Sequence, residues 1–232
     1  MSLFGLDPQS LAARHAAGAH VPTPAESLLR GAAGFTLVSL GGFAPWIFAG
    51  GWFHRHGGDA ALYPTCAAAF VALSGLLLHR LILGTGTLGR CYKVFALAFL
   101  AYAVVWCAAW FGVRGRAGEW AGSALGSAAF AGVLAMAFGS PRAFIAAAVA
   151  LFLLHSAGYF AGGWAYATLG ARTELFGAAL DRATRAMLAR TAWGLFYGLG
   201  FGAGIGLAFH SCQAPARELI RLRDAAATSP NP

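Results

Sequence analysis

The sequence predicts an all-α, polytopic membrane protein: a bundle of six transmembrane helices with one amphipathic interfacial helix between the fifth and sixth spans. Of the 232 residues, 59% are hydrophobic and only 10% are charged, whereas a soluble domain carries about 25% charged residues. The eight carboxylates lie outside the long apolar stretches or, like Glu119, at the very end of one, as expected if those stretches cross hydrocarbon, where an unpaired charge costs several kcal/mol.

Six stretches reach the roughly 20 residues that a helix needs to cross a bilayer. Because the links between most of them are short, neighbouring helices should run antiparallel. The expected spans are 34–53, 62–83, 92–113, 119–139, 143–168 and 192–212. Around them we expect an N-terminal polar or interfacial segment at 1–33, a membrane domain at 34–212 and a polar C-terminal tail at 213–232.

The segment before the first span carries a helix-start signal. "TPAE" at 23–26 reads as a capping box with proline at the first helical position, which predicts a helix from Pro24 into the membrane. Upstream, residues 3–20 favour a weak surface helix. Within the first span, Pro45 should kink the helix unless a neighbour satisfies the carbonyl that it frees.

The longest connection, 171–190, repeats apolar residues at helical spacing and gathers charged residues on the opposite face. This pattern predicts a helix lying along the membrane surface. Beyond it, the tail from Ala214 ends in "TSPNP", and we expect its last residues to be disordered.

The seven tryptophans provide a check on the topology. In an alternating six-span arrangement they all fall towards the face opposite both termini, and tryptophan favours the headgroup level. Nine of the 16 Lys and Arg residues lie on the terminal side and seven on the other. The positive-inside rule therefore places the termini in the cytoplasm, with the chain in a plasma membrane or bacterial-type inner membrane.

A row of glycines runs through the sixth span. Small residues allow helices in a bilayer to approach closely, and similar faces occur on the fourth and fifth spans. We expect the sixth span to pack tightly against one of them, with dimerisation or helix sliding as alternative uses of the row. The predicted helix-packing residues are Gly122, Gly126, Gly158, Gly162, Gly194, Gly198, Gly202 and Gly206.

Histidines are the only candidates for chemistry. His155 lies near the centre of the fifth span, and we expect a hydrogen bond from it to a hydroxyl on a neighbouring helix. His79 and His210 end the second and sixth spans on the same side. Imidazoles from facing helices can ligate haem or a metal, so these three histidines are the candidate cofactor-binding residues, with haem or a pigment as the possible cofactor.

The remaining patterns exclude several classes. The sequence contains no catalytic or phosphate-binding motif of the common families, which argues against an enzyme. The basic residues are dispersed and suit lipid headgroups rather than nucleic acid. The four cysteines lack metal-type spacing and are expected to be free thiols.

Three function classes follow. The first is a non-catalytic structural or accessory subunit of a larger membrane complex or homo-oligomer, packed through its glycine-rich faces and surrounded by the lipid bilayer. The second is a transporter or channel component with His155 in its pathway. The third is a haem- or pigment-binding membrane subunit using His79, His155 or His210.

Overall fold

The computed structural model describes residues 4–228, and these are almost entirely helical. Six helices are long and apolar enough to cross a membrane, as predicted, and they indicate an integral membrane protein. They are α2 (Pro24–Arg55), α3 (Gly58–Leu78) with its extension η1 (His79–Leu81), α4 (Leu88–Val113), α5 (Gly115–Ala137), α6 (Phe144–Ala171) with the preceding turn η2 (Pro141–Ala143), and α7 (Arg182–Cys212).

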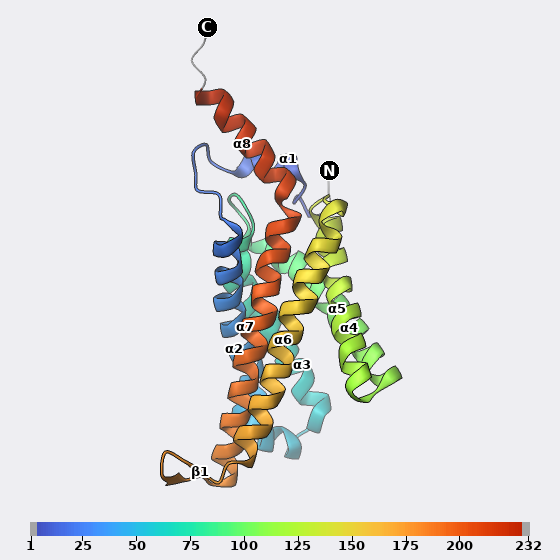
Figure 1. Cartoon of the computed structure of the whole chain (residues 1–232), viewed down its shortest axis with the longest axis vertical. Coiled ribbons are helices and arrows are strands. Elements are labelled where there is room, and N and C mark those ends of the chain that lie inside the picture. The colour runs from blue at the N-terminus through green and yellow to red at the C-terminus, as the bar shows by residue number, and fades with distance from the viewer. Residues whose placement is uncertain (1–3, 229–232) are drawn as a thin grey trace.

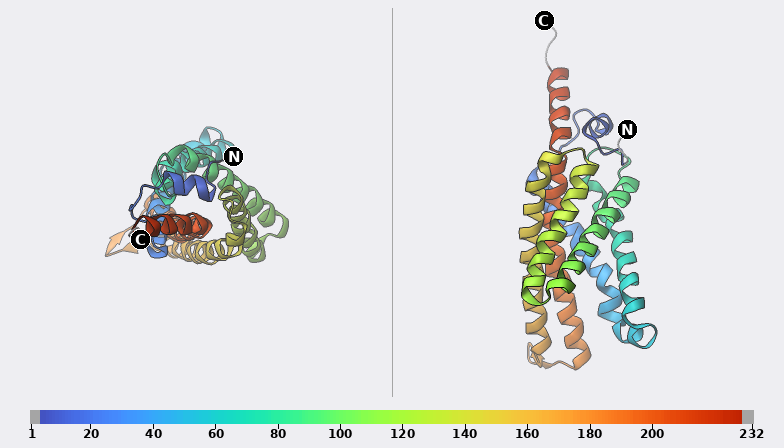
Figure 2. Two further views of the ribbon diagram at one scale, coloured as in Figure 1. Left: turned by 90° about the horizontal axis from the view of Figure 1, so that it is seen from above. Right: turned by 90° about the vertical axis from the view of Figure 1, so that its right-hand side faces the viewer.

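The six long helices form a closed ring. Each packs against its neighbours in sequence, and α7 closes the ring by packing against α2. Figure 1 shows α2, α7 and α6 running side by side, and the view from above in Figure 2 shows the ring end-on. The ring's interior is filled by aromatic and aliphatic side chains, with Phe35, Phe95, Phe130 and Phe201 fully buried.

The two ends of the ring differ. The short helices α1 (Pro8–Arg14) and α8 (Ala214–Thr228) lie at one end, which we call the terminal end (Figure 1). The opposite end, which we call the tryptophan end, holds the hairpin of β1 (Glu174–Leu175) and β2 (Ala178–Ala179). Because neighbouring helices alternate in direction, the tryptophans fall in the halves of their helices nearer this second end.

The predicted start of the first long helix is confirmed. The Glu26 backbone N–H donates to Thr23 Oγ1 at 3.2 Å, and the Thr23 N–H donates to Glu26 Oε2 at 2.8 Å, forming the capping box. The helix is continuous through Pro45. It also begins ten residues before the apolar span at 34, so residues of the expected N-terminal segment take part in helix packing.

The predicted interfacial helix at 171–190 is wrong. Phe176 and Gly177 both have positive φ, of 51° and 81°, the conformation of a two-residue hairpin turn, and β1 pairs with β2 on either side. Asp181 then caps α7, because its Oδ1 accepts from the Thr184 N–H at 2.8 Å. Residues 182–190 therefore form the first turns of the sixth long helix.

Hydrogen bonds from Thr184 keep the capping carboxyl group of Asp181 ionised at neutral pH. The hydrogen bond from the Thr184 backbone N–H, together with one from the Thr184 hydroxyl, lowers the pKa of the Asp181 carboxyl. The carboxylate stays ionised at neutral pH and favours the positive end of the helix dipole. This short interaction, rather than the apolar periodicity of the segment, determines where α7 begins.

At the terminal end, α1 lies across the mouth of the ring (Figure 2). Leu6 and Leu11 are 0% and 1% exposed and belong to the main core. Arg223 of α8 donates to the Ala12 and His15 carbonyls at 3.1 and 2.8 Å, and the Thr85 N–H donates to the Arg14 carbonyl at 3.3 Å. The helix expected within residues 3–20 is thus present but short, and it is tied to both α8 and the α3–α4 link.

The expected polar tail is helical over most of its length. Helix α8 continues beyond the ring in the direction of α7 (Figure 1). The disorder expected of "TSPNP" falls largely on residues 229–232, which lie outside the described residues. All four cysteines are free thiols, in agreement with the prediction.

Candidate functional site

The glycine row of α7 lies against α2. A Cβ added at Gly198 would stand 2.7 Å from Thr36 Cα, and one added at Gly202 would stand 2.7 Å from Phe35 Cβ. At Gly206 it would collide with the Ser27 carbonyl, whereas at Gly194 it would meet only ordinary contacts of 3.6 to 3.7 Å. The row faces the first span, not the fourth or fifth as the sequence suggested.

A second glycine face of α7 meets α6. A Cβ added at Gly158 would stand 2.8 Å from Gly200 Cα, and one added at Gly204 would stand 3.0 Å from Leu151 Cα. Gly162 lies near the Trp193 carbonyl, 3.1 Å from its own added Cβ. The expected contact between the fifth and sixth spans therefore exists, but it uses Gly200 and Gly204 rather than the main row.

The glycines of α5 serve a different purpose. A Cβ added at Gly122 would stand 3.0 Å from the Trp106 ring, and one added at Gly126 would stand 2.9 Å from the Tyr102 ring. These positions leave room for aromatic side chains of α4, and none of them is a contact with α7. Gly126 in particular lets the Tyr102 ring lie flat against α5 and reach the interior of the ring.

His155 lies at the centre of this arrangement. It is 0% exposed, and its Nε2 is 2.7 Å from the Tyr102 hydroxyl, which matches the expected hydrogen bond to a neighbouring helix. Tyr197 and Phe201 of α7 meet the imidazole edge-on, with ring centroids 5.6 and 4.9 Å away. The close α6–α7 approach at Gly158 brings these rings together. We call Tyr102, His155, Tyr159, Tyr197 and Phe201 the histidine cluster.

Several buried polar atoms of α4, α5 and α6 have no hydrogen-bond partner among the described residues. They are His155 Nδ1, Ser156 Oγ, Trp106 Nε1, and the hydroxyls of Ser123 and Ser127. Ser127 Oγ makes no hydrogen bond to His155, so the two do not form the pair of nucleophile and base that a serine hydrolase uses. Buried polar groups normally find a partner, so this group of unpaired atoms marks the interior beside α5 and α6 as a place where a small polar guest or water could bind.

No charged side chain is buried with them. Among residues 4–228 the buried polar side chains are histidine, serine, threonine and glutamine, without Asp, Glu, Lys or Arg. An ion entering the ring would find no counter-charge there. The interior thus suits an uncharged molecule.

A set of adjoining cavities opens at the tryptophan end. One of about 340 Å³ is lined by Arg116, Glu119, Tyr159 and Trp193 among others. A second of about 260 Å³ shares Trp193, and a third of about 410 Å³ shares Trp46 and Leu62 with the second. We call the three together the vestibule. Tyr159 lines it and stacks on the His155 ring with centroids 5.8 Å apart, so one aromatic side chain separates the vestibule from His155.

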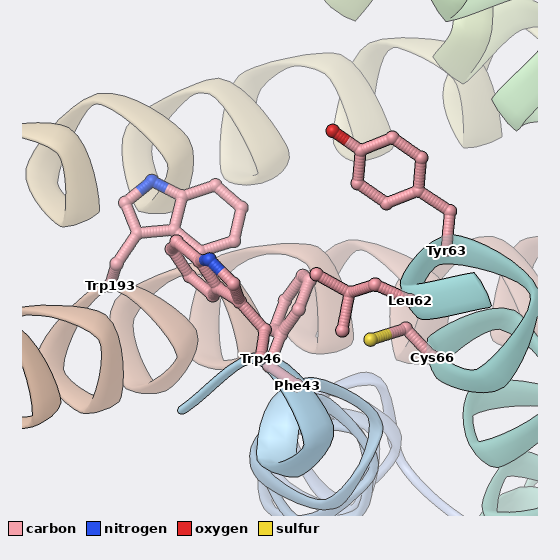
Figure 3. Close-up of a pocket in the computed structure, with 6 residues that line it drawn as sticks. All are labelled: Phe43, Trp46, Leu62, Tyr63, Cys66 and Trp193. Carbon is pink, nitrogen blue, oxygen red and sulfur yellow. The ribbon is translucent and has the colours of Figure 1, made fainter. Parts of the chain in front are cut away.

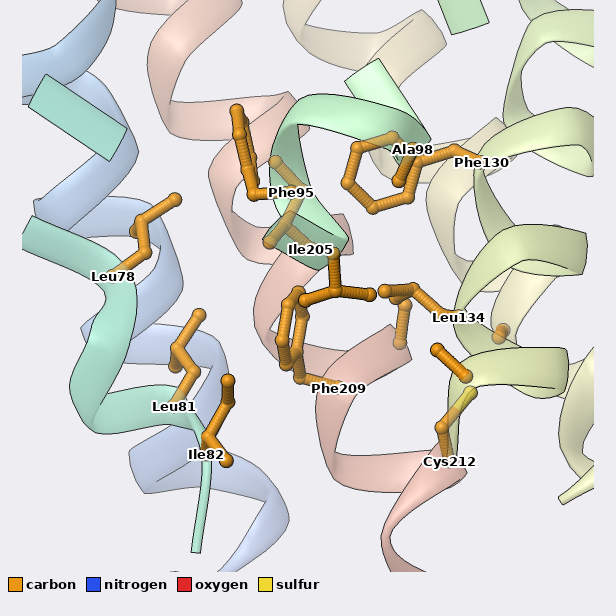
Figure 4. Close-up of a cluster of buried hydrophobic side chains, with 14 of the residues drawn as sticks. Leu78, Leu81, Ile82, Phe95, Ala98, Phe130, Leu134, Ile205, Phe209 and Cys212 are labelled. Carbon is orange, nitrogen blue, oxygen red and sulfur yellow. The ribbon is translucent and has the colours of Figure 1, made fainter. Parts of the chain in front are cut away.

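The terminal end of the ring is closed. Figure 4 shows Leu78, Leu81, Ile82, Phe95, Leu134 and Phe209 filling the interior there, contributed by α3, η1, α4, α5 and α7. The side chains of α1 cover this layer from outside. This apolar layer lies between the terminal end and the histidine cluster, on the side away from the vestibule.

The other two candidate histidines are separate from the histidine cluster. His79 Nδ1 lies 3.1 Å from the Thr87 hydroxyl, and His210 Nδ1 lies 3.2 Å from the Ser27 hydroxyl. Each of the three histidines has a side-chain hydroxyl as partner. Within the part of the chain that the structure describes, no group of three or more His, Cys, Asp or Glu residues could hold a metal ion.

Three important residues were missed by the sequence analysis. Tyr102 holds His155, Gly31 lies against Gly202 and Gly206, and Gln213 links α7 to the α3–α4 connection. Gly31 could have been found, because Ser27 and Gly31 form a small-xxx-small pair in the first helix. Tyr102 and Gln213 carry no local signal, since their partners come from distant segments.

Comparison with known proteins gives no relative for this chain: no family model, curated protein or solved structure matches it. The functional argument therefore rests on the geometry above.

Proposed function

We propose that the protein is a carrier or channel component of the membrane, which admits a small uncharged solute from the tryptophan end and holds it beside His155. The observation that supports this proposal most directly is the vestibule, because Tyr159 in its lining stacks on the His155 ring. The unpaired Nδ1 of that ring and the lack of buried charge among the described residues support an uncharged solute.

In this proposal the solute leaves through the terminal end, which is closed in the structure and would have to open as a gate. Leu6 and Leu11 of the N-terminal segment cover it, and Arg223 holds α1 in place. Displacement of α1 would remove the outer part of this seal. We further propose that this gate faces the cytoplasm, on the excess of Lys and Arg at the terminal side.

Cysteine accessibility tests this proposal. In a Cys107→Ala background, which removes the exposed native thiol, Tyr159→Cys should react with a water-soluble maleimide much faster than Phe209→Cys. Adding Leu11→Asp should raise the reactivity of Phe209→Cys, because the charged side chain cannot stay in the core. Leu222→Asp on the exposed surface of α8 is the matched control. Equal rates at positions 159 and 209, or no reaction at 159, would contradict the proposal.

One observation favours the accessory-subunit class as a second candidate. Helix α8 projects beyond the ring and leaves Leu219 and Leu222 37% and 59% exposed (Figure 1). An apolar stripe on a basic helix outside the bundle is typical of a contact with another protein. A stable partner that co-purifies with the wild-type chain, and is lost with Leu219→Ser and Leu222→Ser, would support this candidate.

A further inference from the structure

We infer that the cavity between α2, α3 and α7 binds an uncharged single-ring compound carrying carbonyl oxygens, of the quinone class. The inference rests on the proposed function and names the solute class that the vestibule would receive. The cavity is the part of the vestibule lined by Phe43, Trp46, Leu62, Tyr63, Cys66 and Trp193, and Figure 3 shows these side chains around it.

The walls of the cavity favour a flat ring. Phe43, Trp46 and Trp193 meet edge to face, with centroids 5.0 Å apart for Phe43 and Trp193 and 6.2 Å apart for Trp46 and Trp193. Leu62 and Cys66 stand opposite (Figure 3). An inserted ring would meet aromatic edges and faces on one side and alkyl and thiol groups on the other, and aromatic pairs are attractive in both arrangements.

The cavity offers two groups that only donate, the indole N–H groups, and one hydroxyl that can donate or accept, that of Tyr63. The indole N–H groups of Trp46 and Trp193 make no hydrogen bond to any described residue, and the Tyr63 side chain is 65% exposed at the rim. Indole nitrogen can only donate. A guest that supplies acceptor oxygens without needing acceptors from the protein is the complementary partner, and a quinone carbonyl does so.

The volume of the cavity and the charges around it narrow the class of ligand further. The volume of about 260 Å³ lies just below the range of about 300–1,000 Å³ for drug-sized ligands, so it suits one substituted ring. None of the six lining residues is charged. The nearest cation is Arg190, whose guanidinium lies 5.0 Å from the centroid of the Trp46 ring and donates to the Trp46 carbonyl at 2.7 Å. Because Arg190 is held by these contacts outside the lining of the cavity, a neutral guest needs no counter-charge from it.

Protection of Cys66 from alkylation tests the inference. In the Cys107→Ala background the other native thiols, Cys91 and Cys212, are 0% and 1% exposed, against 8% for Cys66, so iodoacetamide, a small alkylating reagent, reports on Cys66. The probe is duroquinone. All four of its ring positions carry methyl groups, so the ring has no unsubstituted carbon to which the Cys66 thiol would add. At about ten times its Kd it should slow the reaction about ten-fold, because only the free form reacts.

Conservative variants identify the donors. Trp193→Phe keeps a ring but removes the N–H, and should raise the half-protecting concentration by about five-fold, the value of one net hydrogen bond. Tyr63→Phe tests the rim hydroxyl in the same way. Trp120→Phe is the matched control, because Trp120 contacts Phe152 and Phe160 and does not line this cavity.

Two further arms make the result decisive. Durene, the same methylated ring without oxygens, should protect less than duroquinone, and equal protection would overturn the assignment to carbonyl compounds. Duroquinone should also raise the thermal unfolding midpoint of the wild type but not of Leu62→Trp, which fills the cavity. An unchanged alkylation rate together with an unchanged midpoint would overturn the site, while leaving the accessibility result at positions 159 and 209 as the separate test of the proposed function.

Discussion

The two sides of the ring are packed by different means. On one side, α2, α7 and α6 approach so closely that glycine backbone atoms touch, at Gly31 with Gly202 and at Gly158 with Gly200. On the other side, aromatic side chains supply many of the contacts, as between Phe70 of α3 and Phe99 of α4 and between Phe95 of α4 and Phe130 of α5. Helix α7, which has a glycine face towards each of α2 and α6, is the most buried of the six long helices, with 61% of its apolar stretch inside the structure.

This difference has a mechanical consequence. Backbone contacts cannot adjust without moving whole helices, whereas side-chain contacts change through rotamers. We therefore expect α2, α6 and α7 to move as one body, and the solute to pass along the boundary between that body and α3–α5. The vestibule lies on this boundary, since its lining comes from α2, α3, α5, α6 and α7.

The largest predicted effect breaks the glycine-packed side. Gly206→Leu and Gly198→Leu should each lower the free energy of unfolding by about 3 kcal/mol or more, because overpacking costs typically 1–3 kcal/mol even where side chains can yield. Gly112→Leu on α4 is the matched control, as an added Cβ there meets nothing within 4 Å.

The measurement for these variants is reversible unfolding in mixed micelles. Leu195→Ala, at a side chain that is 39% exposed, should cost less than either glycine variant. If the glycine variants are as stable as Gly112→Leu, the backbone contact between α7 and α2 is not the basis of stability.

The second largest effect is predicted for Gln213, which connects the two sides of the ring at the terminal end. Gln213 is 2% exposed; its Oε1 accepts from the Leu83 N–H at 2.7 Å and its Nε2 donates to the Leu81 carbonyl at 2.8 Å. Gln213→Leu leaves both backbone groups buried without a hydrogen-bond partner and should lower the free energy of unfolding by about 2–4 kcal/mol. Arg221→Ala, which breaks an exposed ion pair with Glu218, should cost less than about 1 kcal/mol. Equal losses in the two variants would show that Gln213 does not couple the two sides.

A smaller effect tests the histidine cluster, where the two sides meet. Tyr102→Phe removes the hydroxyl 2.7 Å from His155 Nε2 and leaves the buried imidazole without a partner among the described residues. We expect a loss of about 1–2 kcal/mol in unfolding free energy. Tyr166→Phe, at a ring that is 41% exposed, should have almost no effect. A neutral Tyr102→Phe would mean that another group, such as bound water, satisfies the histidine.

The smallest predicted effect is spectroscopic. Because His79, His155 and His210 each have a hydroxyl partner and lie apart, the purified protein should show no Soret or pigment band, and haem added in excess should produce no saturable spectral change. A stoichiometric haem spectrum that disappears with His155→Ala would reverse this view and restore the cofactor hypothesis.

The long helices and the α2 cap could be predicted from the sequence because apolar length and the Thr23–Glu26 box are local signals. Ser27 and Gly31 carry a small-xxx-small signal, but their pairing with Gly202 and Gly206 could not be predicted, since it depends on ring closure between the first and last spans. The segment at 171–190 was predicted wrongly because a local signal was overridden. Its apolar residues have helical spacing, but the turn at Phe176–Gly177 and the Asp181 cap determine its structure.

The histidine cluster was half visible in the sequence. His155 stands out as a polar residue in the middle of a span, but its partner Tyr102 is 53 residues away and is brought to it by the space at Gly126. Such a contact depends on tertiary packing and has no pattern in either helix.

A cross-link between α2 and α7 tests the closed ring most directly. A Cβ at Gly194 would lie 3.7 Å from Ser39 Oγ, within reach of a disulfide, so Ser39→Cys with Gly194→Cys in the Cys107→Ala background should oxidise readily in native membranes. Ser39→Cys with Gly163→Cys should not. Efficient cross-linking of the first pair, detected by mass spectrometry after proteolysis, is the predicted result; failure of that pair, with cross-linking of the second, would contradict closure of the ring through the glycine row.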